Sequence, residues 1–145
     1  MSRGERAKEY FLQGYACSQA VALVFSDLLG ISEEEIAKLT LPFGGGLGRQ
    51  RLTCGAVSGM AFVVGGVLAK AENDKENKKQ VYKAVQEVCA KFQEQTGSLI
   101  CAELLSGANA TSLGEAEART AEYYKKRPCA ELVVLAASIL EEYLK

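Results

Sequence analysis

The chain has 145 residues, of which 48% are hydrophobic and 24% are charged, and its formal net charge at pH 7 is −1. We expect one soluble domain over residues 1–145, and the small charge gives no reason to expect nucleic acid or an anionic membrane as a partner. Histidine is absent, which excludes hydrolase mechanisms that use a histidine base, and also histidine-ligated zinc or haem.

The N-terminal part of the chain predicts three helices and no signal peptide. Residues 1–6 lack an apolar run, so we place the protein in the cytoplasm. Gly14 and Gly30 suit the left-handed positions that follow helices, and Ser32 with Glu35 forms a capping box. The expected helices are Glu5–Leu12, Cys17–Leu28 and Ser32–Leu39.

A glycine-rich loop, Phe43–Thr53, carries Arg49 and Arg51 and leads into the most apolar part of the chain. The loop lacks the Gly-Lys-Ser/Thr of a nucleotide P-loop, so we expect it to let the backbone pass close to a cysteine or cofactor. Thr53 is expected to cap a central helix with Cys54 in its first turn.

The expected central helix is apolar on nearly every face, which predicts that it is the buried core of a bundle. Its apolar run, Ala56–Ala69, is too short to span a bilayer. Gly55 and Gly59 lie one turn apart and would let another backbone approach this end of the helix. A long apolar helix in a small bundle is also compatible with a homodimer.

The C-terminal half predicts further helices and no strands. Ser98 is expected to cap the short helix at Cys101, Ser112 with Glu115 to cap a polar helix, and Pro128 to open the last helix. The expected elements are a long amphipathic helix from Asn73–Asp74 to Gly97, a short helix Cys101–Leu105, a loop Gly107–Thr111, a polar helix Ser112–Tyr124 and a last helix from Pro128. We therefore predict an all-α helical bundle.

Four of the five cysteines fall within the first turn of an expected helix, and these four are Cys17, Cys54, Cys101 and Cys129. A helix N-terminus offers unpaired N–H groups and the positive end of the helix dipole, and both favour a thiolate. We interpret the four as a cluster of activated, catalytic thiols with low pKa values. Cys89 lies in the middle of a helix and is expected to pack in the core.

Positive charge flanks two of these cysteines. Arg49 and Arg51 precede Cys54, and the segment Lys125–Arg127 precedes Cys129. Arg49 and Arg51 would lower thiol pKa values and hold an anionic substrate, cofactor or redox partner. For Lys125 and Lys126 we prefer an ordinary solvated loop.

Metal binding is the second interpretation of the same four cysteines. Four thiolates suit zinc, iron or an iron–sulfur cluster. The cysteines are separated by 37, 47 and 28 residues, so each ligand would come from a separate helix and only the finished fold could bring them together. Thiol–disulfide exchange needs only pairs, and which cysteines pair stays open.

The chain resembles a family of redox-active proteins that is named for its C-GCAxxG-C-C cysteine pattern. The residues that carry the resemblance are Tyr15–Val21, Phe43–Gly46, Cys54–Gly59, Cys101–Leu104 and Cys129. A literal Gly-Cys-Ala is absent, because Cys54 is followed by Gly55 and Ala56. The resemblance implies a small, mostly helical bacterial or archaeal protein with a redox role, and it assigns that role to the four cysteines and not to Cys89.

Our leading hypothesis is a thiol–disulfide redox protein that exchanges electrons with a partner protein or with a small-molecule thiol or oxidant. The alternative is a metal or iron–sulfur protein in which the four cysteines are the ligands. A third hypothesis is a helical interaction module whose cysteines only pack in the core.

Overall fold

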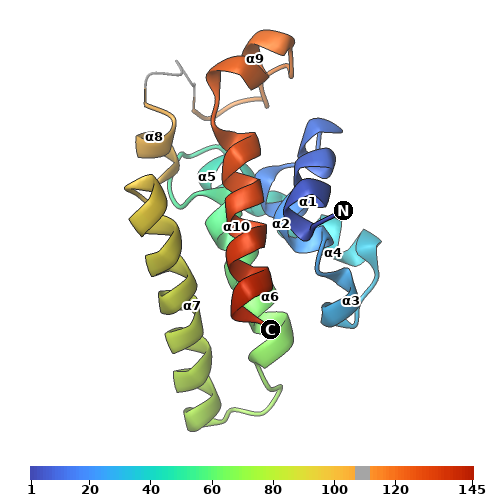
Figure 1. Cartoon of the computed structure of the whole chain (residues 1–145), viewed down its shortest axis with the longest axis vertical. Helices are drawn as coiled ribbons and strands as arrows, with labels where there is room; N and C mark the ends of the chain where they lie inside the picture. Colours follow the sequence, from blue (N-terminus) through green and yellow to red (C-terminus); the bar gives the residue numbers. More distant parts are fainter. Residues whose placement is uncertain (107–111) are drawn as a thin grey trace.

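A computed structural model describes residues 1–106 and 112–145, and the described residues form an all-α structure (Figure 1). The elements are α1 (Arg3–Leu12), α2 (Cys17–Leu23), α3 (Ser26–Leu29), α4 (Glu33–Thr40), the 3-10 helix η1 (Leu41–Phe43), α5 (Gly44–Leu47), α6 (Gly55–Leu68), α7 (Lys75–Thr96), α8 (Cys101–Leu104), α9 (Ala121–Lys126) and α10 (Cys129–Tyr143). No β-strand occurs in these residues, and Thr53 and Ile100 form an isolated antiparallel bridge. The predicted fold class is confirmed.

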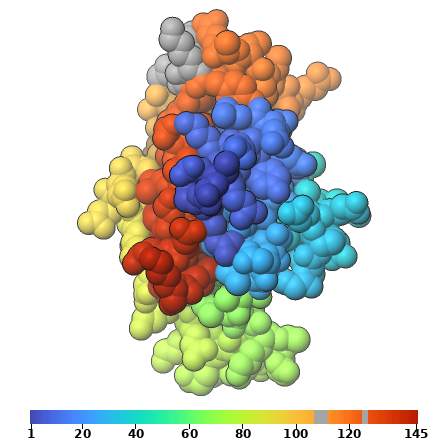
Figure 2. Space-filling model, turned by 45° about the vertical axis from the view of Figure 1, so that its right-hand side comes forward, coloured from blue at the N-terminus to red at the C-terminus, as the bar shows by residue number. Residues whose placement is uncertain are grey.

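Helices α6 and α10 form the centre of the bundle, with α7 on one side and α1 and α2 on the other (Figure 1). α10 packs against α1, α2, α6 and α7, and α6 packs mainly against α2 and α7. Figure 2 shows α1 and α10 side by side on one face of the molecule. Because α6 and α10 both begin near α5 and α8, the starts of several helices meet at one end of the bundle.

The central helix α6 begins one residue later than predicted. Cys54 is its N-cap, and Thr53 does not cap it because the backbone of Thr53 pairs with Ile100. The helix is buried over most of its length, but Val67 and Leu68 at its C-terminal end are each 37% exposed. Among the described helices, none is long and apolar enough to cross a membrane.

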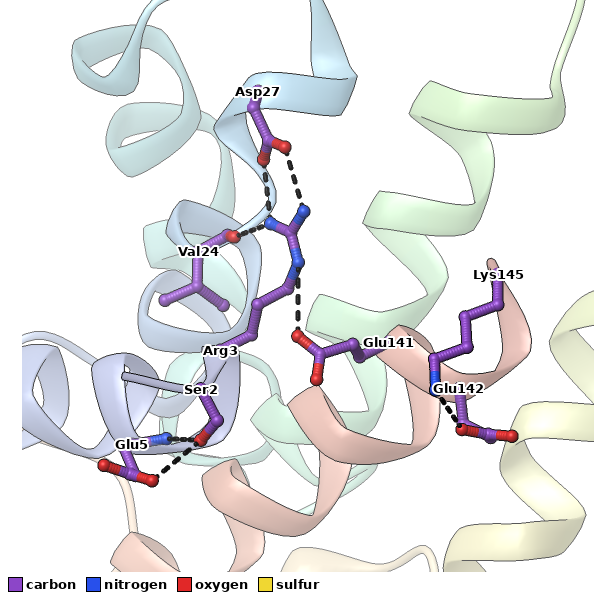
Figure 3. Close-up of polar contacts among 8 residues, drawn as sticks. All are labelled: Ser2, Arg3, Glu5, Val24, Asp27, Glu141, Glu142 and Lys145. Atoms are coloured by element: carbon purple, nitrogen blue, oxygen red, sulfur yellow. Dashed lines mark hydrogen bonds and ion pairs between the residues drawn. The ribbon is translucent and has the colours of Figure 1, made fainter.

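The expected helix Cys17–Leu28 is broken into α2 and α3 at Val24 and Phe25. Arg3 holds this break: its guanidinium donates to the carbonyl of Val24 and lies 4.6 Å from the centre of the Phe25 ring (Figure 3). It also forms a bidentate pair with Asp27 at 2.8 and 2.9 Å and contacts Glu141 at 3.5 Å. One arginine therefore joins α1, α3 and α10.

The polar helix predicted for Ser112–Tyr124 is wrong. Residues 112–120 are irregular, and a short helix begins only after Thr120, whose side chain accepts a hydrogen bond from the N–H of Tyr123. The side chains of Glu117 and Arg119 contact distant parts of the chain, and these tertiary contacts outweigh a weak local helix preference. The loop expected at Gly107–Thr111 lies outside the described residues.

Gly55 and Gly59 let α2 approach α6 closely, as predicted. A Cβ atom at Gly55 would lie 3.3 Å from the backbone nitrogen of Ser18, and one at Gly59 would lie 3.0 Å from the carbonyl oxygen of Ser18 and from Val21 Cβ. Val21 is fully buried, so it has little room to move. The contact also brings the first residue of α2, Cys17, next to the start of α6.

This packing predicts opposite effects for one substitution at two positions of α6. Gly59→Ala should lower the free energy of unfolding by about 1 kcal/mol, because the strain of an overpacked site outweighs the gain in helix propensity. The matched control Gly65→Ala, where a Cβ meets no atom within 4 Å, should raise it by about 0.5–1 kcal/mol. Urea denaturation measures both. Stabilisation of the same size at both positions would show that α2 does not press on Gly59.

Candidate functional site: a cavity lined by four thiols

The four helix-start cysteines line one cavity of about 230 Å³. Cys17, Cys101 and Cys129 are the first residues of α2, α8 and α10, and Cys54 is the N-cap of α6. Cys54, Cys101 and Cys129 are 5%, 7% and 8% exposed, so their thiols face the interior. We call this space the thiol cavity. Cys89 does not line it and is half-buried on α7.

A short backbone pairing places Cys54 beside Cys101. The N–H of Cys54 donates to the carbonyl of Leu99 at 2.8 Å, and the N–H of Cys101 donates to the carbonyl of Leu52 at 2.6 Å. These bonds flank the Thr53–Ile100 bridge. Residues 47 positions apart in the sequence are thereby brought to the same wall of the cavity.

The glycine-rich loop passes close to a cysteine, as the sequence predicted. Gly46 has a φ of 73°, and a Cβ there would lie 2.7 Å from Cys101 Cβ and 2.7 Å from the backbone nitrogen of Leu52. Only glycine fits this conformation and this space. Arg49 and Arg51 also have positive φ values, 66° and 61°, a strained conformation for residues with side chains. The loop therefore holds both arginines in unusual backbone positions beside the thiols.

The ionisation of Cys17 is linked to that of Cys129. Hydrogen bonding between the two side chains is the largest cause of opposite shifts in their pKa values, up at Cys17 and down at Cys129. The positive charges of Arg127, Arg119 and Arg51 lower the pKa of Cys129 further, while burial opposes them. Cys129 is therefore the thiol of this pair that ionises first.

The prediction that all four thiols have low pKa values is wrong for Cys17, Cys54 and Cys101. Burial raises the pKa of Cys54 to about 12, although the N–H groups of Ala56 and Val57 favour its thiolate. Burial also raises the pKa of Cys101, against the effect of Arg51, whose Nη1 lies 3.7 Å from Cys101 Sγ. A place at a helix start does not offset the loss of water around a buried thiol.

Four arginines line the thiol cavity around one carboxylate. Glu117 pairs with Arg49 and Arg51 at 3.3 Å each, and it also pairs with Arg127. Arg119 donates to the carbonyls of Phe11 and Tyr15 at 2.7 and 2.8 Å, and its guanidinium lies 4.4 Å from the centre of the Phe11 ring. Arg49 and Arg51 thus lie where the sequence placed them, next to the cysteines.

Sequence reasoning missed Glu117 and Arg119. Both belong to residues 112–120, which the sequence assigned to a polar surface helix, and no local motif distinguishes them from solvated charges. Arg127 was noted only as part of a basic segment, yet it is buried at the cavity. The side chains of Lys125 and Lys126 lie outside the described part of the chain.

A metal centre with four cysteine ligands needs four sulfurs around one point. In residues 1–106 and 112–145, no group of three or more cysteine, aspartate or glutamate side chains is arranged to hold a metal ion. The four cysteines share a cavity, and the zinc, iron or iron–sulfur alternative stays a prediction.

One of the comparisons with known proteins gives a match, and this match is to a family model. The model of the family described as "Putative redox-active protein (C_GCAxxG_C_C)" matches residues 15–143, a range that contains all four cysteines of the cavity. No curated protein and no solved structure gives a significant match to the chain. With most of its length matched, and with the cysteines of the pattern lining one cavity, this chain belongs to the C_GCAxxG_C_C family of redox-active proteins.

Proposed function

We propose that this protein carries out thiol–disulfide exchange, with Cys129 as the attacking thiol and Cys17 as the resolving thiol. The observation that carries the proposal is that Cys17 and Cys129 line the same cavity, each as the first residue of its helix. A disulfide needs its two Cα atoms within about 7 Å of each other, and two neighbouring helices can provide this separation. Both cysteines begin helices that pack on each other, α2 and α10.

The exchange proceeds in two steps that conserve atoms and electrons. The Cys129 thiolate attacks one sulfur of a substrate disulfide, forming a mixed disulfide and releasing one substrate thiolate. Cys17 then loses its proton to the released thiolate and attacks the Cys129 sulfur, which releases the second substrate thiolate and leaves a Cys17–Cys129 disulfide. The substrate disulfide gains two electrons, and the two cysteines lose them.

The surroundings of the pair suit these roles. Arg127, Arg119 and Arg51 favour the Cys129 thiolate, so a larger fraction of this thiol is nucleophilic at neutral pH. Cys17 stays protonated until Cys129 has been consumed, because its pKa is raised by its hydrogen bond to Cys129 and by burial. The raised pKa values of Cys54 and Cys101 give them no attacking role in this scheme. They line the same thiol cavity.

Variants of the pair test the assignment of roles. Reduced protein is treated with bis(2-hydroxyethyl) disulfide, and its mass and peptide linkages are measured. The wild type should lose two thiols and form a Cys17–Cys129 cross-link. Cys17→Ser should accumulate one mixed disulfide on Cys129, because the resolving thiol is gone, and Cys129→Ser should form no adduct in the cavity.

Cys89→Ser is the matched control, since Cys89 lies outside the cavity, and it should behave as the wild type does. A cross-link between other cysteines, or a mixed disulfide on Cys54 or Cys101 instead of Cys129, would contradict the proposal.

The hydrogen bond at Cys129 predicts a pH dependence. Removal of a hydrogen bond to a charged group costs about 1.5–3 kcal/mol, so Cys17→Ala should raise the pKa of the Cys129 thiol by about one unit or more. Alkylation of Cys129 by iodoacetamide then needs a correspondingly higher pH. Cys17→Ser keeps a donating hydroxyl and should show a smaller shift. Mass spectrometry of the Cys129 peptide across pH measures both, and equal pKa values in wild type and Cys17→Ala would contradict the assigned bond.

A further inference from the structure

The charges that line the thiol cavity are strongly unbalanced. Among the described residues of its wall, four arginines face one carboxylate, Glu117, so the lining carries an excess of three positive charges when the thiols are neutral and of two when Cys129 is ionised. The whole chain, in contrast, has a net charge of −1. All four guanidinium groups have polar or aromatic partners in the fold. It is therefore the net positive charge of the lining, and not an unpaired arginine, that favours an anion here.

Burial makes this excess significant. The side chains of Arg49, Arg51 and Arg127 are 14%, 11% and 6% exposed, so water screens them less than it screens surface charges. Charges away from water are normally balanced by partners of opposite sign. Arg119 contacts neutral groups within the described part of the chain, namely the two carbonyls and the rings of Phe11 and Tyr123. A negatively charged occupant would complete the balance.

The arginine cluster already binds a carboxylate of the chain itself. Three guanidinium groups that come from two separate loops, through Arg49, Arg51 and Arg127, meet on the carboxylate of Glu117. Guanidinium groups match the planar, two-oxygen geometry of carboxylates. The geometry of the arginine cluster is therefore suited to a carboxylate.

The remaining walls are apolar, and the cavity is small. Phe11, Leu41, Leu105 and Leu132 line it, and a volume of about 230 Å³ corresponds to several water molecules. An apolar wall with a few convergent charged groups is typical of sites for small organic ligands. Such a cavity suits a short carbon chain that ends in an anionic group better than it suits a bare inorganic ion.

Resting on the exchange chemistry proposed for Cys129, we propose that the substrate is a small organic disulfide that carries a carboxylate. Its anionic end lies against the arginines of the cavity, and its sulfurs reach the Cys17–Cys129 pair. In the exchange, the disulfide is reduced to two carboxylate-bearing thiols while the two cysteines are oxidised to a disulfide. The arginines bind and orient the substrate and also keep Cys129 ionised.

Three disulfides that share two methylene groups between each sulfur and its polar end, but differ in charge, test this proposal. The probes are 3,3′-dithiodipropionate, bis(2-hydroxyethyl) disulfide and cystamine, which are anionic, neutral and cationic. The rate of Cys129 modification by each probe is divided by the rate of the same probe with the neutral thiol 1-thioglycerol, which removes differences in intrinsic reactivity. Cys89→Ser protein serves as background, so that the fifth thiol does not contribute. The normalised rate for the anionic probe should exceed that for cystamine by about tenfold or more.

Arginine variants locate the preference. Arg49→Gln should reduce the anion-to-cation ratio at least threefold and leave the neutral probe less affected. Arg6→Gln is the matched control, because Arg6 does not line the cavity, and it should keep the wild-type ratio. The unreactive thioether 3,3′-thiodipropionate gives a measurement independent of exchange: it should raise the Tm of the wild type more than that of Arg49→Gln.

The outcomes separate the two proposals. If no probe modifies Cys129, the exchange function fails, and stabilisation by the thioether still decides whether the cavity takes a carboxylate. If all three probes react at similar normalised rates, or if cystamine is preferred, exchange stands and the anionic substrate is overturned. A ratio unchanged in Arg49→Gln, or lowered equally in Arg49→Gln and Arg6→Gln, would overturn the assignment to the cavity arginines.

Discussion

The close contact between α2 and α6 is the constraint on which the rest of the structure depends. It exists because Gly55 and Gly59 have no side chains where the backbone around Ser18 passes. The contact brings Cys17 to the start of α6 and aligns the two helices against which α10 packs. A larger residue at Gly55 would separate Cys17 from the N-cap Cys54. Backbone packing, more than any side-chain bond, therefore brings the first two thiols together.

A second set of contacts, made by Glu117 and Arg119, fixes the segment 112–120 against the cavity. Glu117 pairs with arginines from the glycine-rich loop and with Arg127, the C-cap of α9. Arg119 anchors the same segment to the carbonyls of Phe11, in α1, and Tyr15, just after it. The irregular segment 112–120 is thus held by charge and not by local structure. It carries positive charge to the thiols, and this charge acts in a buried place where water screens it weakly.

The pKa values of the four thiols show how two physical effects compete. Each thiol lies at a helix start, where dipoles and N–H groups favour the anion, yet burial raises the pKa of Cys54 and Cys101 in spite of this. At Cys129 a hydrogen bond from Cys17 and three arginines outweigh the cost of burial. The family model matches residues 15–143, but the cysteine pattern alone does not distinguish these environments.

The sequence by itself determined the all-α class, the position of the four cysteines at helix starts and the close approach of backbone at Gly46, Gly55 and Gly59, because these depend on local periodicity, capping and residue size. It could not determine the break between α2 and α3, the irregular segment 112–120 or the roles of Glu117 and Arg119. Those features depend on charged side chains whose partners lie far away in the sequence. Only the tertiary structure decided which thiols influence each other's ionisation, which are buried away from water and which have arginines nearby.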